Sequence, residues 1–210
     1  MRKKSIITKI EVQKKNPKRR SVYLNGEFAF GISEEVFFKF PLAENKEIDE
    51  KEIEKILFEE KKVLAREIAL KFLSYRPRTE KELIKKLKSK GFEEEILEET
   101  VRNLKRLNLI EDYEYAKNFV NERLRLSPRG ENLLRQELWK KGIEKETIDE
   151  VLKEVFESKN EEEIAQKVLE KAKKKYRNLD KEVAQRRIKG FLLRRGFSFE
   201  TVNELVKDSD

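Results

Sequence analysis

Three stretches of the chain follow one pattern: ELIKKLKSKGF at 82–92, NLLRQELWKKGI at 132–143 and RIKGFLLRRGF at 187–197. Each stretch ends in basic residues, then a glycine, then an apolar residue. The glycines are Gly91, Gly142 and Gly196, which lie 51 and 54 residues apart. A period near 50 residues indicates a tandem array of similar units rather than one globule.

Apolar residues recur at fixed distances from each glycine. Four residues before it stand Leu87, Leu138 and Leu192, eight before it Leu83, Leu134 and Ile188, and five or six after it Ile96, Ile148 and Val202. This spacing predicts a helix that ends where glycine takes the left-handed conformation, followed by another helix. A further helix, holding Ala69, Ala116 or Ala165, precedes each stretch. The pattern helix–helix–glycine–helix therefore occurs three times, and neighbouring units complete one another's cores.

The first 61 residues predict a different module. Asn25-Gly26 separates two β-rich runs, which favours a type I′ hairpin within a two- or three-stranded sheet from Ile6 to Ile32. Ser33 is typical of the N-cap of a short helix that Pro41 stops, and Asp49 of the cap of a longer helix. We expect that longer helix to run from about residue 50 to 74, with a break near Lys61-Lys62.

These patterns predict a mainly α fold of three three-helix repeats after a small β-hairpin and helix module. The predicted division is 1–61 for the N-terminal module, 62–110 for the first repeat, 111–158 for the second and 159–210 for the third. Capping boxes are expected at Thr79 with Glu82 and at Asn160 with Glu163.

Composition excludes several kinds of chemistry. The chain has no cysteine and no histidine, so disulfides, thiolate nucleophiles, Cys/His zinc sites and imidazole catalysis are ruled out. No glycine-rich phosphate loop occurs. We therefore expect no enzyme, no cofactor and no metal. The sequence has no apolar run long enough to span a membrane and no signal-peptide pattern, so we expect a cytoplasmic protein.

Positive charge is unevenly distributed along the chain, whose formal net charge is +8. Residues 1–20 hold nine Lys and Arg against one Glu, and residues 61–110 hold fourteen against eight acidic residues. Such a bias favours contact with a polyanion or an acidic protein surface.

Several segments together resemble the RecX family, modulators of the RecA recombinase. They are YLNGEFAFGI at 23–32, FLSYRPRTEKELIKKLKSKGF at 72–92, LNLIEDYEYAKNFVNERL at 107–124, SPRGENLLRQELWKKGI at 127–143 and FLLRRGFSFETV at 191–202. The most specific parts are Arg-Pro-Arg-Thr at 76–79, Leu-Ile-Glu-Asp-x-x-Tyr-Ala at 109–116 and Arg-Arg-Gly-Phe at 194–197.

The resemblance implies an elongated, curved array of three tandem three-helix repeats. It also implies binding along the groove of the RecA–single-stranded DNA filament, with inhibition or modulation of filament extension, ATPase, strand exchange and coprotease activity. The implied partners are the RecA filament and single-stranded DNA, reached directly or through the filament. We expect the chain to be a monomer when alone.

Four basic patches are the candidate partner or nucleic-acid contacts. They are the N-terminal arm (Lys14, Lys15, Lys18, Arg19, Arg20), the first repeat (Arg76, Arg78, Lys85, Lys86, Lys88, Lys90), the second (Arg123, Arg125, Arg129) and the third (Arg186, Arg187, Arg194, Arg195). Each has a plainer interpretation. The arm can be a solvated loop, the lysines can keep the helix soluble, and the arginines can brace helix ends or pair with Glu182 or Glu200.

The aromatic residues are expected to be mainly structural. Trp139, Tyr113, Tyr115 and Phe119 lie at helical spacings beside Leu and Ala, which favours a core position over a platform for nucleobases. Five phenylalanines, Phe28, Phe30, Phe37, Phe38 and Phe40, are expected to seal the N-terminal module onto the first repeat, with an exposed subset as the alternative.

Two other functions remain open from the sequence. A stand-alone protein that binds single-stranded nucleic acid also fits the basic bias, and it would bind with strong salt dependence in the absence of RecA. A nuclease is disfavoured, because no spaced set of carboxylates stands out from the helical Lys/Glu background.

Overall fold

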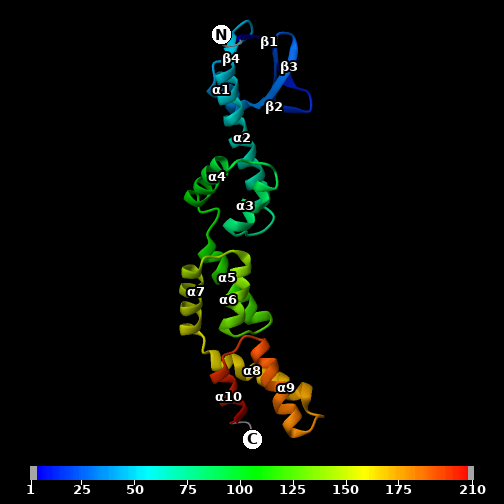
Figure 1. Ribbon diagram of the computed structural model, residues 1–210, viewed down its shortest axis with the longest axis vertical. Coiled ribbons are helices and arrows are strands. Elements are labelled where there is room, and N and C mark those ends of the chain that lie inside the picture. The colour runs from blue at the N-terminus through cyan, green and yellow to red at the C-terminus, as the bar shows by residue number, and fades with distance from the viewer. Residues whose placement is uncertain (1–3, 208–210) are drawn as a thin grey trace. The chain divides into compact units, whose positions relative to one another are not determined.

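The computed structural model describes residues 4–207, so the ends of the predicted N-terminal module and third repeat, 1–3 and 208–210, lie outside the described residues. Over these described residues the chain is mainly helical and has a single antiparallel sheet near its start (Figure 1). Its contacts divide it into two compact units. One holds the residues up to 76 together with 86–104, and the other holds 77–85 together with 105 onward.

The sheet of the first unit has four strands in the order β3-β2-β1-β4. The strands are β1 Lys4–Gln13, β2 Asn16–Leu24, β3 Glu27–Ser33 and β4 Glu47–Asp49. Asn25 and Gly26 both have positive φ, 51° and 91°, which confirms the predicted hairpin turn. The prediction of two or three strands missed β4, which pairs with β1 over three residues only and is too short to show alternation.

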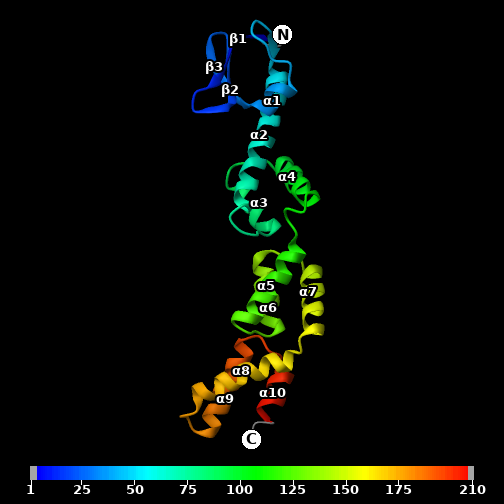
Figure 2. The ribbon, with the colours of Figure 1, turned by 180° about the vertical axis from the view of Figure 1, so that it is seen from behind.

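Two helices complete the core of this module: α1, Glu34–Lys39, and α2, Glu50–Leu73 (Figure 2). Both predicted caps are confirmed, since Ser33 accepts a hydrogen bond from the Val36 amide and Asp49 forms a capping box with Glu52. The core is a cluster of aliphatic residues with one phenylalanine: Ile7, Val22, Phe30, Ile32, Val36, Ile48, Ile56 and Val63.

The predicted break of α2 near Lys61-Lys62 is wrong, because the helix runs without interruption for 24 residues. No Gly or Pro interrupts it, and Lys62 extends to Glu59 (3.3 Å) and Glu99 (2.7 Å). The N-terminal half of α2 covers the sheet, and Ala65 and Ala69 in its C-terminal half are fully buried. The predicted boundary between residues 61 and 62 therefore falls inside one helix.

The repeats have the predicted order of helices. The remaining helices are α3 Glu80–Lys88, α4 Glu94–Arg106, α5 Asp112–Leu126, α6 Glu131–Lys141, α7 Lys145–Ser158, α8 Glu161–Tyr176, α9 Lys181–Arg194 and α10 Phe199–Lys207. Gly91, Gly142 and Gly196 follow α3, α6 and α9 with φ of 82°, 87° and 86°. At each glycine the next amide donates back to the carbonyl five residues earlier, as in Ile143 to Leu138 (3.2 Å).

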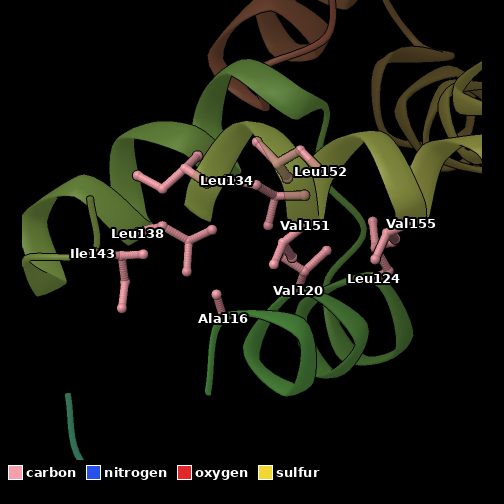
Figure 3. Close-up of a cluster of buried hydrophobic side chains, with 10 residues drawn as sticks. Ala116, Val120, Leu124, Leu134, Leu138, Ile143, Val151, Leu152 and Val155 are labelled. Carbon is pink, nitrogen blue, oxygen red and sulfur yellow. The ribbon is translucent and has the colours of Figure 1, made fainter. Parts of the chain in front are cut away.

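Each of the last two repeats has a core of its own. In the second repeat, Ala116 and Val120 from α5 meet Leu134 and Leu138 from α6 and Val151 from α7 (Figure 3). In the third repeat, the corresponding cluster comes from α8, α9 and α10 and includes Phe197, the residue after the glycine. This apolar residue folds back onto the helices, as the sequence pattern predicts.

Within the second unit, a recurring contact joins the start of one middle helix to the glycine turn of the next repeat. The amide of Gly130, just before α6, donates to the Arg195 carbonyl (2.9 Å), and that of Asn132 donates to the Gly196 carbonyl (3.1 Å). At the start of α3, the Thr79 hydroxyl donates in the same way to the Lys141 carbonyl (2.8 Å). We call each of these contacts a junction.

A carboxylate completes both junctions. The amide of Glu80 donates to Asp112, the first residue of α5 (2.9 Å), and the amide of Glu131 donates to Glu161, the first residue of α8 (3.0 Å). Each carboxylate thus satisfies an amide at the start of a helix in the preceding repeat. At the predicted capping boxes, Thr79 accepts from the Glu82 amide (3.2 Å) as predicted, whereas Asn160 accepts from the Glu162 amide (2.9 Å) rather than from that of Glu163.

We predict that Gly130→Ala weakens the junction between the second and third repeats. Gly130 has an ordinary φ of −76°, so no strain arises there, but an added Cβ would lie 2.4 Å from the backbone of Gly196. Overpacking of this kind costs about 1–3 kcal/mol. Hydrogen exchange should then quicken in α8–α10.

Gly91→Ala is the matched control for that measurement. An added Cβ meets nothing within 4 Å there, and only the left-handed φ of 82° is strained, at about 1–2 kcal/mol. It should leave exchange in α8–α10 unchanged. Equal exchange in Gly130→Ala and the wild-type chain would contradict the role assigned to the junction.

We predict a pH-dependent contribution from the two junction carboxylates. Burial raises the pKa of Asp112 and of Glu161, against the backbone hydrogen bond that each accepts. When the pKa of a carboxyl group is higher in the folded than in the unfolded state, the folded state binds more protons between the two pKa values. The contribution of the group to the free energy of unfolding therefore falls as the pH rises from the unfolded-state pKa to the folded-state pKa. Asp112→Asn keeps the acceptor oxygen without the charge, so its stability relative to wild type should rise through this window. Urea unfolding from pH 4 to 7 measures the difference, and Asp112→Ala, which loses the cap, should be about 1 kcal/mol less stable.

Candidate partner and nucleic-acid interface

The N-terminal arm contains two kinds of basic residue. Lys14 and Lys15 form the turn between β1 and β2, and Lys18 follows on β2; all three are exposed. Within residues 4–207, none of the three forms an ion pair. The expectation of a loop holds only for Lys14 and Lys15, since residues 16–20 belong to β2. The three lysines therefore lie at or beside the tip of a hairpin.

Arg19 and Arg20 are committed to the fold. Arg19 pairs with the buried Glu60 of α2 (2.7 Å), and the same carboxylate accepts hydrogen bonds from the amide and hydroxyl of Ser33 (2.7 and 2.8 Å). Arg20 pairs with Glu34 (3.1 Å) and lies over the ring of Phe37, 4.4 Å from its centroid. These two arginines hold the sheet against α1 and α2, so the lysines of the tip are the stronger candidates for a partner.

The patch on the first repeat is only partly compensated. Lys88 pairs with Glu94 (2.9 Å), and Lys86 lies 5.8 Å from the centroid of the Phe72 ring. Lys85 and Lys90 are exposed. Arg76 is exposed, whereas Arg78 is largely buried and lies 4.0 Å from Glu82, four residues on. The exposed lysines remain candidates, and Arg78 braces the start of α3.

Three of the predicted arginines of the second and third repeats converge at one junction. Arg123 of α5 lies 3.3 Å from Glu137 of α6, and Arg129, just before α6, pairs with the same carboxylate. Arg195, at the end of α9, donates to the Ser127 hydroxyl (2.9 Å) and the Pro128 carbonyl (3.3 Å). Burial and the charges of Arg123 and Arg195 lower the pKa of Arg129.

The other arginines of these repeats lie apart from that cluster. Arg125, Arg186, Arg187 and Arg194 are exposed. Among residues 4–207 no ion pair joins Arg186, Arg187 or Arg194 to Glu182 or Glu200, the plainer interpretation that the sequence left open. Their charges are directed to solvent and are available to an anionic partner.

Aromatic rings flank the arginine cluster. Lys141 lies over Tyr115 and Phe119 of α5, 5.4 and 5.1 Å from the centroids, and Arg123 lies 4.7 Å from Phe119. Arg195 lies 5.2 Å from Phe191 of α9. Lys141 and Arg195 both immediately precede the repeat glycine. Lys141 is not among the residues predicted from the sequence, although its register relative to Gly142 matches that of Arg195 and could have revealed it.

The expectation for the aromatic residues is confirmed in part. Tyr113, Tyr115 and Phe119 pack against the core of the second repeat, but Trp139 is 63% exposed, so its predicted core position is wrong. Leu138 takes the inward face of α6, and the next residue along the helix necessarily points elsewhere. Phe30, Phe37 and Phe40 belong to the core of the N-terminal module, whereas Phe28 and Phe38 are exposed.

Within residues 4–207, no group of three or more acidic, His or Cys side chains is arranged to hold a metal ion. No helix in that range is both long and apolar enough to cross a membrane. What the site presents is positive charge beside aromatic rings, which suits binding of an anionic partner.

Comparison with known proteins connects these features to one family. Four family models match in order along the chain: the regulatory protein RecX N-terminal domain at 5–49 and the first, second and third RecX three-helix domains at 65–104, 112–152 and 160–206. The chain belongs to the RecX family. The N-terminal RecX domain covers the sheet, and the three RecX three-helix domains correspond to the three glycine-containing units.

Individual RecX proteins match over nearly the whole chain. Regulatory protein RecX of Limosilactobacillus reuteri is 35% identical over 96% of this chain and 75% of its own length, and that of Clostridioides difficile is 35% identical over 96% and 94%. A crystal structure of a regulatory protein RecX has a TM-score of 0.79 at 34% identity and covers 97% of this chain and 99% of that chain. The structure of RecX from Lactobacillus salivarius, at 29% identity, has a TM-score of 0.65 and covers 70% and 96%.

Membership in the RecX family confirms the predicted family, the mainly helical fold with three three-helix domains, and a regulatory rather than enzymatic protein. It does not test the individual basic residues, which remain predictions.

We predict that the fluorescence of this RecX-family chain behaves as that of an exposed indole. Trp139 is the only tryptophan, so the signal is unambiguous. Its 63% exposure should give a red-shifted emission that acrylamide quenches efficiently in the folded protein. Unfolding in urea should change the emission maximum little. A blue-shifted emission protected from acrylamide would show that Trp139 is covered in solution.

Proposed function

We propose that this chain binds the RecA–single-stranded DNA filament in its groove and inhibits or modulates filament extension, ATPase, strand exchange and coprotease activity. The observation that carries the proposal is the match of all four RecX domains, in order, together with relatives of nearly equal length named regulatory protein RecX.

The distribution of charge supports a filament as the partner. Exposed basic residues without an ion pair among residues 4–207 occur on the hairpin tip and in each of the three repeats, Arg125 being the one in the second, so every part of the array can contact an anion. A polymer of protein and nucleic acid offers a series of acidic and phosphate groups to such a chain. That the chain is monomeric when alone, and cytoplasmic, stays a prediction from the sequence.

The experiment measures the DNA-dependent ATPase of RecA with increasing amounts of this chain, at several salt concentrations. Substoichiometric chain should lower the rate, because a protein that stops filament extension acts at few sites. Unchanged ATPase and strand exchange over the whole salt range would contradict the proposal.

Charge variants separate the hairpin tip from general electrostatics. The triple change Lys14→Gln, Lys15→Gln and Lys18→Gln should weaken the effect on RecA and reduce its salt dependence. The matched control removes three lysines that already have a carboxylate partner: Lys4 with Glu47, Lys39 with Glu59 and Lys117 with Glu154. The control has the same net charge as the triple variant and should retain more of the effect. Equal loss in both would assign the role to net charge rather than to the tip.

A second function, binding of single-stranded nucleic acid without RecA, is favoured by the cations that lie over Phe119 and Phe191. Base stacking on aromatic rings beside cations is the usual basis of such binding. Tight, salt-sensitive binding of oligothymidylate to the chain alone would support it, and weak binding at physiological salt would favour the filament as the sole partner.

A further inference from the structure

The junction between the second and third repeats gathers more positive than negative charge. Three guanidinium groups lie close together there: Arg123 and Arg129 share one carboxylate, Glu137, and the charges of Arg123 and Arg195 both act on Arg129. The Arg129 side chain is 20% exposed, against 36% for that of Arg123. The Nε of Arg129 is buried and has no hydrogen-bond partner within the described residues. Partly buried cations without matching anions destabilise a fold, so this arrangement has a cost.

Part of this arrangement recurs at the other junction: Arg78, with a side chain 17% exposed, stands 51 residues before Arg129, and Lys141 precedes Gly142 as Arg195 precedes Gly196. The residue at the place of Arg123 differs. In the first repeat, 51 residues earlier, Phe72 stands where the second repeat has Arg123, and Lys86 stands where it has Glu137. Lys86 lies over Phe72 there, so the same position in the same kind of repeat is filled without an arginine cluster. The third guanidinium, that of Arg123, is thus an addition of this junction to a pair of cations that both junctions have.

A neighbouring arginine on α6 shows the usual compensation. Arg135 contacts two carboxylates, Glu131 at 2.7 Å and Asp149, which together raise its pKa. One guanidinium therefore has two anions at Arg135, whereas at the junction two guanidinium groups share the single carboxylate of Glu137 and the third, that of Arg195, donates to the Ser127 hydroxyl and the Pro128 carbonyl.

We propose that Arg123, Arg129 and Arg195 form a binding site for a phosphate group. A phosphate offers several acceptor oxygens, and guanidinium groups match them with paired, charge-assisted hydrogen bonds. The Ser127 hydroxyl, which already accepts from Arg195, borders the site. Glu137 competes with the phosphate for Arg123 and Arg129. The site does not depend on the proposed action on RecA, because it is tested with the chain alone.

Two ligands with this chemistry distinguish the source of the phosphate. One is oligothymidylate, which carries backbone phosphodiesters, and the other is inorganic pyrophosphate, a free polyphosphate. Binding is measured by isothermal titration and by the rise in the unfolding temperature of the full-length chain. Tighter binding of the oligonucleotide at equal phosphate concentration assigns the site to a nucleic-acid backbone, and tighter binding of pyrophosphate assigns it to free phosphate.

Two variants of the proposed phosphate site are expected to change its affinity in opposite directions. Arg129→Gln should weaken binding about tenfold, the effect of losing one charge-assisted contact. Glu137→Gln should strengthen binding severalfold, because it removes the competing carboxylate. A misfolded variant does not gain affinity, so Glu137→Gln keeps its meaning even if Arg129→Gln is unstable.

Each variant has a control with the same change of charge. Arg135→Gln removes a compensated arginine from α6, the helix that follows Arg129, and Glu146→Gln removes a carboxylate from the start of α7, beyond the other end of α6. Both should leave affinity within about twofold of wild type, since surface charges at a distance are screened. The site is disproved if neither ligand binds, or if Arg129→Gln and Glu137→Gln behave like their controls.

Discussion

The second unit depends on the left-handed glycine turn that ends the middle helix of each repeat. Its free carbonyls accept hydrogen bonds from the start of the preceding middle helix, and glycine alone lets that backbone approach, since a Cβ at Gly196 would meet Leu133 at 2.4 Å. The glycine thereby ends the middle helix and lets the following apolar residue fold back into the core of the same repeat. It also leaves room for the backbone of the neighbouring repeat to pack against the turn. The conserved geometry of the turn at Gly142 and Gly196 explains why the junctions resemble each other, down to the carboxylate contributed by Asp112 and Glu161.

The regular features of the fold could be predicted because they follow from local chemistry. Asn25-Gly26, Ser33, Asp49 and the three glycines each specify a backbone conformation that few other residues adopt, and the structure has each of them where expected. The features that were missed depend on contacts distant in sequence. Strand β4 forms because β1 offers an edge, and α2 continues past Lys61 because Glu93, just before α4, and Glu99 of α4 compensate its lysines.

The candidate interface shows the same limit. Sequence alone treats the five basic residues of the arm alike, whereas Glu60, far along the chain, takes Arg19 into the fold and leaves the three lysines exposed. Likewise, Arg129 and Arg195 belong to different repeats and come together only across a junction. The predicted core position of Trp139 is wrong because its place beside leucines on a helix does not determine whether its side chain points toward the core or toward solvent.

The unbroken α2 has a consequence for how the first unit opens. The N-terminal half of its 24 residues packs on the sheet and the C-terminal half packs in the first repeat. Unfolding either half of the helix would therefore disturb both cores. We therefore expect the sheet module and the first repeat to open together. The amides in the middle of α2 should exchange with solvent more slowly than the other amides of this unit. A sheet module joined through a flexible loop would instead fluctuate on its own, and the lysines at its tip would be presented from a mobile base.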